Sequence, residues 1–126
     1  MKTKRFSALL MMLLLFGVKT SCMYAEEVVN MQYIGKQNDH LEHFIPADQP
    51  DVYYDDVSQV IIIDGGGEVT YYDVEIAPVS TFVPVISTQV NGFYDTIDVS
   101  TLPQGEYFIS ISSPEDHTFE GYFEIE

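Results

Sequence analysis

The chain has 126 residues, of which 20 are Asp or Glu and only five are Lys or Arg. All of the acids lie from Glu26 onward, where Lys36 is the sole cation, so one lysine against 20 carboxylates gives residues 26–126 a formal charge of −19. A field of this sign repels polyanions, which argues against nucleic acid and anionic membrane surfaces as partners. Acidic side chains on exposed strand faces also favour solubility and hinder edge-to-edge pairing.

The first 25 residues have the layout of a secretory signal peptide: a basic start, an apolar run from Phe6 to Val18, and a polar stretch that ends near Ala25. The apolar run is 13 residues long, whereas a helix needs roughly 20 to span a bilayer. We therefore expect no stable membrane span. We expect cleavage after Ala25, one domain over residues 26–126, and a secreted, periplasmic or cell-surface location.

Cys22 raises lipoprotein anchoring as an alternative. Thr20 and Ser21 fit the small positions before a lipid-bearing cysteine, but Lys19 stands where an apolar residue is expected. The sequence therefore favours a free protein over a lipidated one. With cleavage after Ala25 no cysteine remains, so the apolar core must stabilise the domain without disulfides.

The remainder of the chain predicts an all-β protein, because short β-branched and aromatic runs recur between turn residues without a sustained helical period. Val28–Ile34 is the expected first strand, and Gln37–Asp51 is an expected polar loop. Val52–Asp55 predicts a short strand. Gln59–Asp64 predicts a strand buried on both faces, because Val60–Ile63 is continuously apolar.

The glycine run Gly65–Gly67 predicts a hairpin turn into the next strand, Glu68–Ile76. The inward-facing phase of that strand changes between Tyr71 and Tyr72, which predicts a bulge.

Pro78 should end that strand, and Thr81–Thr88 is expected to lie at a sheet edge because Pro84 has no N–H to donate. Asn91-Gly92 predicts a second hairpin, which leads into a strand at Thr96–Val99.

The segment Leu102-Pro103-Gln104-Gly105-Glu106-Tyr107 reads L-x-x-G-x-Y, the pattern of a tyrosine corner in an immunoglobulin-like sandwich. In such a corner Gly105 permits a tight turn, and the Tyr107 ring packs inward while its hydroxyl bonds to backbone a few residues upstream. Leu102, Gly105 and Tyr107 are thus the expected structural residues. The predicted fold is an immunoglobulin-like β-sandwich of about seven antiparallel strands.

The last two predicted strands alternate cleanly. Tyr107, Ile109 and Ile111 should face the core, and after a turn at Pro114–Asp116 the final strand should bury Phe119, Gly121, Phe123 and Ile125. Glu120, Tyr122, Glu124 and Glu126 should then face solvent. A one-residue slip would bury three carboxylates, so the register is tightly specified.

The sequence contains no convincing catalytic constellation, and we expect neither an enzyme nor a cofactor. Its histidines are His40, His43 and His117. The first two could ligate a metal with Asp39 and Glu42, but His-x-x-His outside a helix does not fix the geometry, so a polar surface loop is the preferred interpretation. His117 is expected to be solvated.

Calcium is a second candidate ligand, because carboxylates gather in one stretch of the chain and before the glycine run. The acids concerned are Asp48, Asp51, Asp55, Asp56 and Asp64. No EF-hand spacing is present, so charged loops are the preferred interpretation and weak calcium binding is the alternative.

Several aromatic residues are candidates for exposure on a sheet face, where they could stack on sugar rings or anchor a protein partner. They are Tyr53 or Tyr54, Tyr71, Phe108 and Tyr122. Ordinary cross-strand packing is the competing explanation.

The order of motifs resembles a group of short secreted immunoglobulin-like proteins of Gram-negative anaerobes, a domain of unknown function. The motifs are Met31–Gly35, a Pro-bearing loop, the paired apolar strands, the Gly105-x-Tyr107 corner and the ending Gly121–Ile125. The resemblance implies a sandwich and carries over no catalytic residue.

A weaker likeness links the segment from Tyr72 through Tyr107 to the C-terminal sorting domains of type IX secretion cargo. Those domains follow a large effector and end in Lys-containing strands, whereas this chain ends in Phe123–Glu126. We interpret this likeness as a shared fold and not a shared task.

The expected function is a secreted or surface-associated module with a non-enzymatic binding or structural role and an unidentified protein or glycan partner. The alternative is a carbohydrate-binding accessory protein of the cell envelope. A glycosidase with two carboxylates is disfavoured, because a sandwich of this size leaves little material for a cleft.

Overall fold

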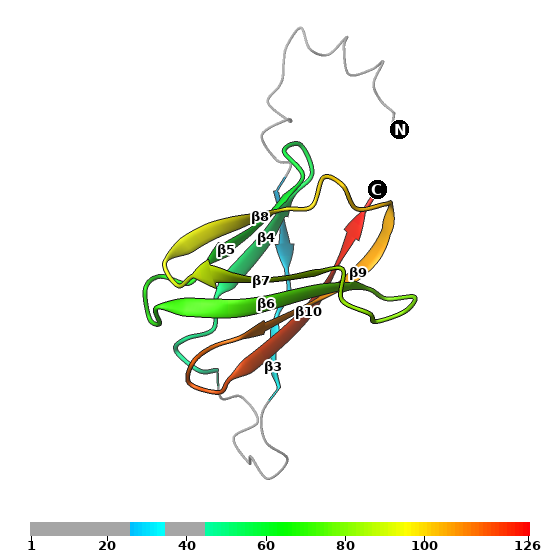
Figure 1. Cartoon of the computed structure of the whole chain (residues 1–126). Coiled ribbons are helices and arrows are strands. Elements are labelled where there is room, and N and C mark those ends of the chain that lie inside the picture. Colours follow the sequence, from blue (N-terminus) through cyan, green and yellow to red (C-terminus); the bar gives the residue numbers. More distant parts are fainter. Residues whose placement is uncertain (1–25, 35–44) are drawn as a thin grey trace, which may run out of the picture.

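The computed structural model describes residues 26–34 and 45–126, which form two packed antiparallel sheets (Figure 1). The strands are β2 (Glu26–Val29), β3 (Gln32–Ile34), β4 (Asp51–Asp55), β5 (Val60–Asp64), β6 (Tyr71–Pro78), β7 (Ile86–Asn91), β8 (Tyr94–Asp98), β9 (Gly105–Ser112) and β10 (Thr118–Ile125). The five-stranded sheet has the order β3-β10-β9-β6-β7, and the four-stranded sheet has the order β2-β4-β5-β8. The all-β sandwich prediction is confirmed, with nine strands in these residues instead of about seven.

The first predicted strand, Val28–Ile34, is divided between the two sheets. β2 pairs with β4 in the four-stranded sheet, whereas β3 pairs with β10 in the five-stranded sheet. The crossing at Asn30 and Met31 passes over Gly121, where a Cβ atom would lie 2.9 Å from the Asn30 carbonyl oxygen and 2.7 Å from the Met31 sulfur. Glycine at this position therefore lets the chain change sheets.

Both predicted turns are present, but the prediction that each forms a hairpin is wrong, because each turn joins strands of different sheets. Gly65–Gly67 leads from β5 to β6, and Asn91-Gly92 leads from β7 to β8. The two crossings lie against each other: the Gly65 N–H donates to the Phe93 carbonyl at 3.0 Å. A Cβ atom on Gly92 would lie only 1.8 Å from the Val69 carbonyl oxygen, so this glycine is required by close backbone approach.

The bulge predicted within β6 is also absent from the described ladder. Pairing with β7 is continuous from Tyr71 to Ile76, because the phase change coincides with the start of the strand. The next strand, β7, lies at a sheet edge as predicted, but it begins at Ile86, so Pro84 precedes it.

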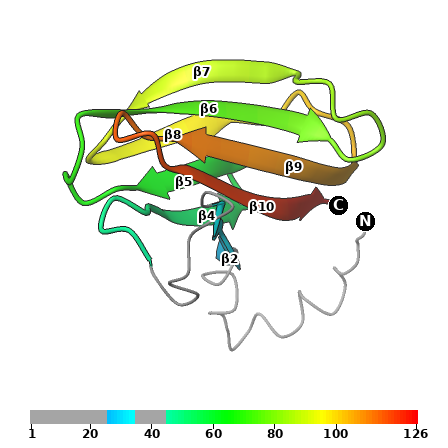
Figure 2. The ribbon, with the colours of Figure 1, turned by 90° about the horizontal axis from the view of Figure 1, so that it is seen from below.

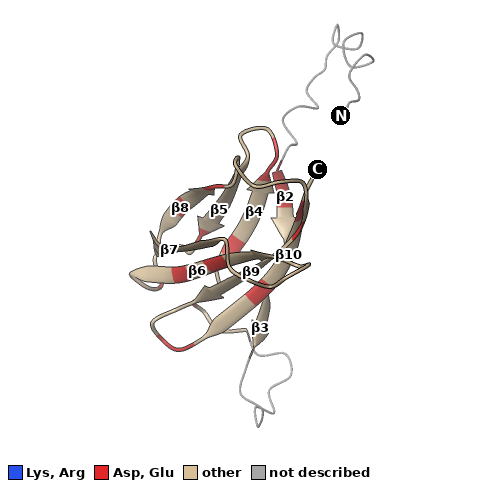
Figure 3. Ribbon diagram, turned by 45° about the vertical axis from the view of Figure 1, so that its right-hand side comes forward, with Lys and Arg blue, Asp and Glu red and all other residues tan. Residues whose placement is uncertain are grey.

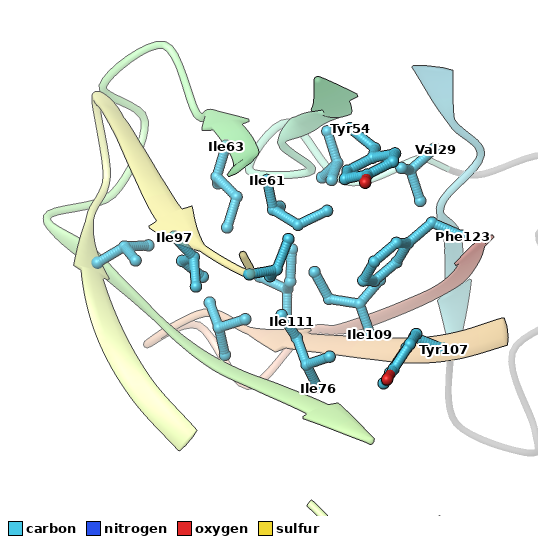
Figure 4. Packing of buried hydrophobic residues seen from close by; sticks show 14 of the residues in the cluster. Val29, Tyr54, Ile61, Ile63, Ile76, Ile97, Tyr107, Ile109, Ile111 and Phe123 are labelled. Atoms are coloured by element: carbon cyan, nitrogen blue, oxygen red, sulfur yellow. The ribbon is translucent and has the colours of Figure 1, made fainter. Parts of the chain in front are cut away.

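The core lies between the two sheets and is dominated by isoleucine, valine and aromatic rings (Figure 4). The alternation predicted for β9 and β10 is confirmed, since every inward position named from the sequence is buried. Ile61, Ile62 and Ile63 are all no more than 7 % exposed, as expected for a strand covered on both faces.

The tyrosine corner has the predicted geometry. The Tyr107 hydroxyl donates to the Pro103 carbonyl at 2.6 Å, and its ring stacks on Phe123 with the centroids 5.7 Å apart. Gly105 has φ +148°, a conformation that favours glycine, and Leu102 packs against the core. The corner thereby joins the β8–β9 loop to the inner face of the five-stranded sheet.

Candidate binding face

A row of three aromatic rings lies on the outer face of the five-stranded sheet. Phe108 of β9 is directly opposite Tyr122 of β10, and their ring centroids are 5.4 Å apart. Phe82 comes from the β6–β7 loop and meets Phe108 edge-on, again at 5.4 Å. Phe82 and Tyr122 are 53 % and 52 % exposed. We call Phe82, Phe108 and Tyr122 the aromatic row.

Strand alternation explains why these rings face outward. Tyr107 and Ile109 are buried in the core, so Phe108 between them must point to the other face of the sheet. Ala77 of β6 is directly opposite Phe108 on the same outer face, yet it is only 4 % exposed. The aromatic row thus continues into a covered apolar position on β6.

The backbone of Phe82 is held in an uncommon conformation. Its φ of +55° lies in the left-handed region, which bulky residues rarely occupy. Its N–H donates to the Pro78 carbonyl at 2.7 Å, and the Val83 N–H donates to the Thr81 hydroxyl at 3.2 Å. This tight turn places the Phe82 ring beside Phe108 and not in the core.

A groove of about 640 Å³ lies between the β6–β7 and β8–β9 loops. We call it the corner groove; its walls are Pro78–Ser80 with Val85 on one side and Leu102–Tyr107 on the other. The Val79 N–H donates to the Glu106 carbonyl at 2.9 Å and ties the two walls together. The β6–β7 loop, the start of β9 and the end of β10 meet at this end of the sandwich (Figure 2). The groove and the aromatic row share the β6–β7 loop.

Apart from the aromatic row and the corner groove, a polar cluster surrounds the buried carboxylate of Asp48. Ser113 Oγ donates to Asp48 Oδ2 at 2.5 Å, and His117 Nδ1 lies 2.9 Å from Asp48 Oδ1. The Tyr72 hydroxyl donates to the Asp48 carbonyl at 2.7 Å. The prediction that His117 is solvated is therefore wrong: its ring is held by Asp48 and meets Tyr33 edge-on at 5.4 Å.

This cluster is built to hold the fold together. In a catalytic serine–histidine arrangement the hydroxyl donates to the imidazole, whereas the Ser113 hydroxyl donates to the Asp48 carboxylate. Asp48 and Ser113 are only 5 % and 6 % exposed. Burial, with the charge of Asp48 as the next contribution, raises the pKa of Tyr72 to about 12, so the hydroxyl stays a donor.

Two further acids among the calcium candidates, Asp55 and Asp64, hold local turns. Asp55 accepts a hydrogen bond from the Val57 N–H at 3.0 Å, and Asp64 accepts one from the Gly66 N–H at 3.2 Å. Within residues 26–34 and 45–126, no group of three or more His, Cys, Asp or Glu side chains is placed to hold a metal ion. Weak calcium binding stays a prediction. The predicted cluster of Asp39, His40, Glu42 and His43 lies outside the described residues.

The aromatic candidates divide into exposed and buried groups. Tyr122 is exposed and Phe108, Tyr53 and Tyr71 are half-buried, whereas Tyr54 is buried in the core. The sequence does not indicate Phe82 as an exposed ring, because Thr81–Thr88 predicts a strand. The two prolines Pro78 and Pro84 that bracket it were the available signal for a loop.

Comparison with solved structures finds a DUF3244 family protein from Bacteroides vulgatus, described as an immunoglobulin-like β-sandwich. The identity is 15 % with a TM-score of 0.62, and the match covers 80 % of this chain and 99 % of that chain. This likeness shows the fold. The chain matches no protein family model and no curated protein. None of the described residues forms a helix long and apolar enough to cross a membrane.

Proposed function

We propose that the chain is a small, non-enzymatic binding module of the cell envelope or the extracellular space, and that the aromatic row is its contact surface. The observation that carries this proposal is the exposure of Phe82 and Tyr122 on a sheet face where polar residues would suffice for solubility. Exposed aromatic side chains that lie close together are typical anchors of binding surfaces.

The neighbouring residues extend this surface. Val83 is 62 % exposed and Val85 is 50 % exposed, and both follow Phe82 in the β6–β7 loop. Contiguous apolar exposure of this kind on a small domain marks interaction sites more often than isolated apolar residues do. The corner groove adds a concave region beside it.

The proposed location rests on the sequence. The basic start, the Phe6–Val18 apolar run and the polar stretch to Ala25 form the signal segment. Secretion with cleavage near Ala25 would release a module whose first paired residue is Glu26. Mass spectrometry of the exported protein tests this step, since an acylated Cys22 at the new N-terminus would support the anchored alternative instead.

A carbohydrate ligand is the alternative role for the same surface. Sugar rings stack best on a flat platform, but the ring planes of Phe82 and Phe108 are inclined by 71°, and those of Phe108 and Tyr122 by 58°. This inclination suits side chains that enter between the rings, and it favours a polypeptide partner over a glycan.

Paired peptide and glycan arrays test the proposal. The row variant Phe108→Ser/Tyr122→Ser removes two rings. The control Phe93→Ser/Tyr94→Ser removes two exposed rings from the β7–β8 turn and the first residue of β8. We expect the parent and the control to bind the same probes and the row variant to lose them. Equal binding by the row variant, with unchanged circular dichroism, would refute the proposal. Retention on glycans alone would instead support the carbohydrate role.

A further inference from the structure

The outward residues of β10 alternate between acid and aromatic side chains. Glu120, Tyr122 and Glu124 lie at two-residue spacing on one face of the strand. Such positions repeat every ~7 Å along an extended chain. A carboxylate therefore flanks the Tyr122 ring on each side.

The neighbouring strands strengthen this charge pattern. Glu106 is directly opposite Glu124, so two like charges occupy one cross-strand pair. On the other side of the aromatic row, Ser110 is directly opposite both Glu120 and Glu75. Like charges placed directly opposite each other destabilise a sheet, so an incoming cation would relieve a cost already present in the fold.

No positive side chain of the described residues offsets these acids. Residues 26–34 and 45–126 contain neither Lys nor Arg, as the colouring of Figure 3 shows. His117, the histidine among these residues, lies against Asp48 within the buried polar cluster and not on this face. The four carboxylates Glu75, Glu106, Glu120 and Glu124 thus face solvent around an apolar centre.

We propose that this face binds an extended polypeptide segment of a protein partner in which two basic residues flank an apolar one, in the pattern basic-x-apolar-x-basic. The period of that segment matches the acid-x-aromatic-x-acid period of Glu120, Tyr122 and Glu124, because both chains are extended. This inference rests on the proposed function and names the chemistry of the partner.

The contacts follow from ordinary side-chain chemistry. Guanidinium or ammonium groups would pair with Glu120 and Glu124 and lie against the exposed ring of Tyr122 between them. The apolar residue between them would enter the space between the inclined rings, and the segment could continue into the corner groove. The acids supply orientation and association rate, while the rings supply most of the buried apolar area.

Fluorescence anisotropy with two labelled peptides tests the inference. One peptide has an arginine-serine-leucine-serine-arginine core; the other has the same composition with the arginines adjacent, so that total charge is equal and only the spacing differs. We expect saturable binding of the spaced peptide, weaker binding of the scrambled one, and a loss of affinity as salt increases.

Matched variants separate this site from the general negative field of the protein. Glu120→Gln/Glu124→Gln should weaken the spaced peptide about three- to tenfold, since each exposed pair contributes modestly. Tyr122→Ser should weaken it about threefold through the lost cation–π contact. The control Glu26→Gln/Glu115→Gln removes two exposed carboxylates away from this face and should change the affinity less than twofold.

Three results would overturn the inference: equal affinity for the two peptides, an equal loss in the control pair, or no saturable binding at millimolar peptide. If the spaced peptide does not bind, but a neutral peptide or a glycan binds the parent and is lost in Phe108→Ser/Tyr122→Ser, the cationic partner is refuted while the proposed function stands. If nothing on the arrays depends on those two rings, both proposals fail.

Discussion

Replacement of Tyr107 by phenylalanine isolates the hydrogen bond of the tyrosine corner. The residue is 3 % exposed, and its hydroxyl is 2.6 Å from the Pro103 carbonyl oxygen. Tyr107→Phe keeps the ring and its stacking on Phe123 but leaves that carbonyl without its donor. We expect a loss of about 1–1.5 kcal/mol in the free energy of unfolding.

Tyr107→Ala removes the ring as well and should cost about 3–5 kcal/mol, the range for a buried aromatic side chain. For a domain of this size each kcal/mol lowers Tm by about 4–8 °C. Urea denaturation followed by far-ultraviolet circular dichroism measures both losses, and the m-value should not change.

Tyr122→Phe is the matched control, because it removes a hydroxyl from a tyrosine that is 52 % exposed. Its effect should stay within ~0.5 kcal/mol. If Tyr107→Phe is no less stable than Tyr122→Phe, the corner hydrogen bond contributes nothing to stability and our reasoning about residue 107 is refuted.

Three further predictions concern other parts of the fold. Asp48→Ala removes the carboxylate that contacts the Ser113 hydroxyl and the His117 imidazole, and it should lower the free energy of unfolding by about 2–4 kcal/mol in chemical denaturation. Asp51→Ala on the surface should change the free energy of unfolding by less than ~0.5 kcal/mol. Equal effects would contradict the proposed role of Asp48. Gly92→Ala should lower Tm more than Gly66→Ala, because a Cβ atom on residue 92 would clash with the Val69 carbonyl. A Cβ atom on residue 66 meets nothing within 4 Å, so that variant has only the backbone strain of φ +69°. The reverse order of Tm values would argue against the backbone contact. Partial desolvation and then the charges of Asp56, Glu126 and Glu124 raise the pKa of Glu27, so the folded protein loses stability as pH rises through that pKa and the carboxyl ionises. Glu27→Gln should therefore raise Tm at pH 7, and this gain should vanish toward pH 4. A gain that persists in acid would show that charge is not its cause.

Local patterns in the sequence predicted the elements whose structure depends on nearby residues. The alternation of β9 and β10 follows from which side chains are apolar, and the Tyr107 hydrogen bond spans only four positions. The partner strand of each element was harder to predict. Gly65–Gly67 and Asn91-Gly92 mark turns correctly, but a turn signal does not say whether the chain returns in the same sheet or enters the other one.

The candidate sites show the same limit. Phe108 and Tyr122 were identified as exposed aromatic candidates, yet their pairing with Phe82 depends on the left-handed turn of the β6–β7 loop. The bond between Asp48 and His117 joins positions 69 residues apart. No local period relates those two residues, so the sequence predicts a charged loop with weak calcium binding as the alternative for Asp48, and a solvated position for His117.

The division of residues 26–34 between two sheets has a consequence for resistance to proteolysis. β2 covers the edge of β4, and β3 covers the edge of β10, so one short stretch covers one edge of each sheet. A protease that trimmed the chain past Asn30 would uncover β4, and a cut beyond Ile34 would uncover β10 as well. Uncovered edges recruit other strands. Proteolysis within residues 26–34 would thus expose unpaired strand edges that favour aggregation.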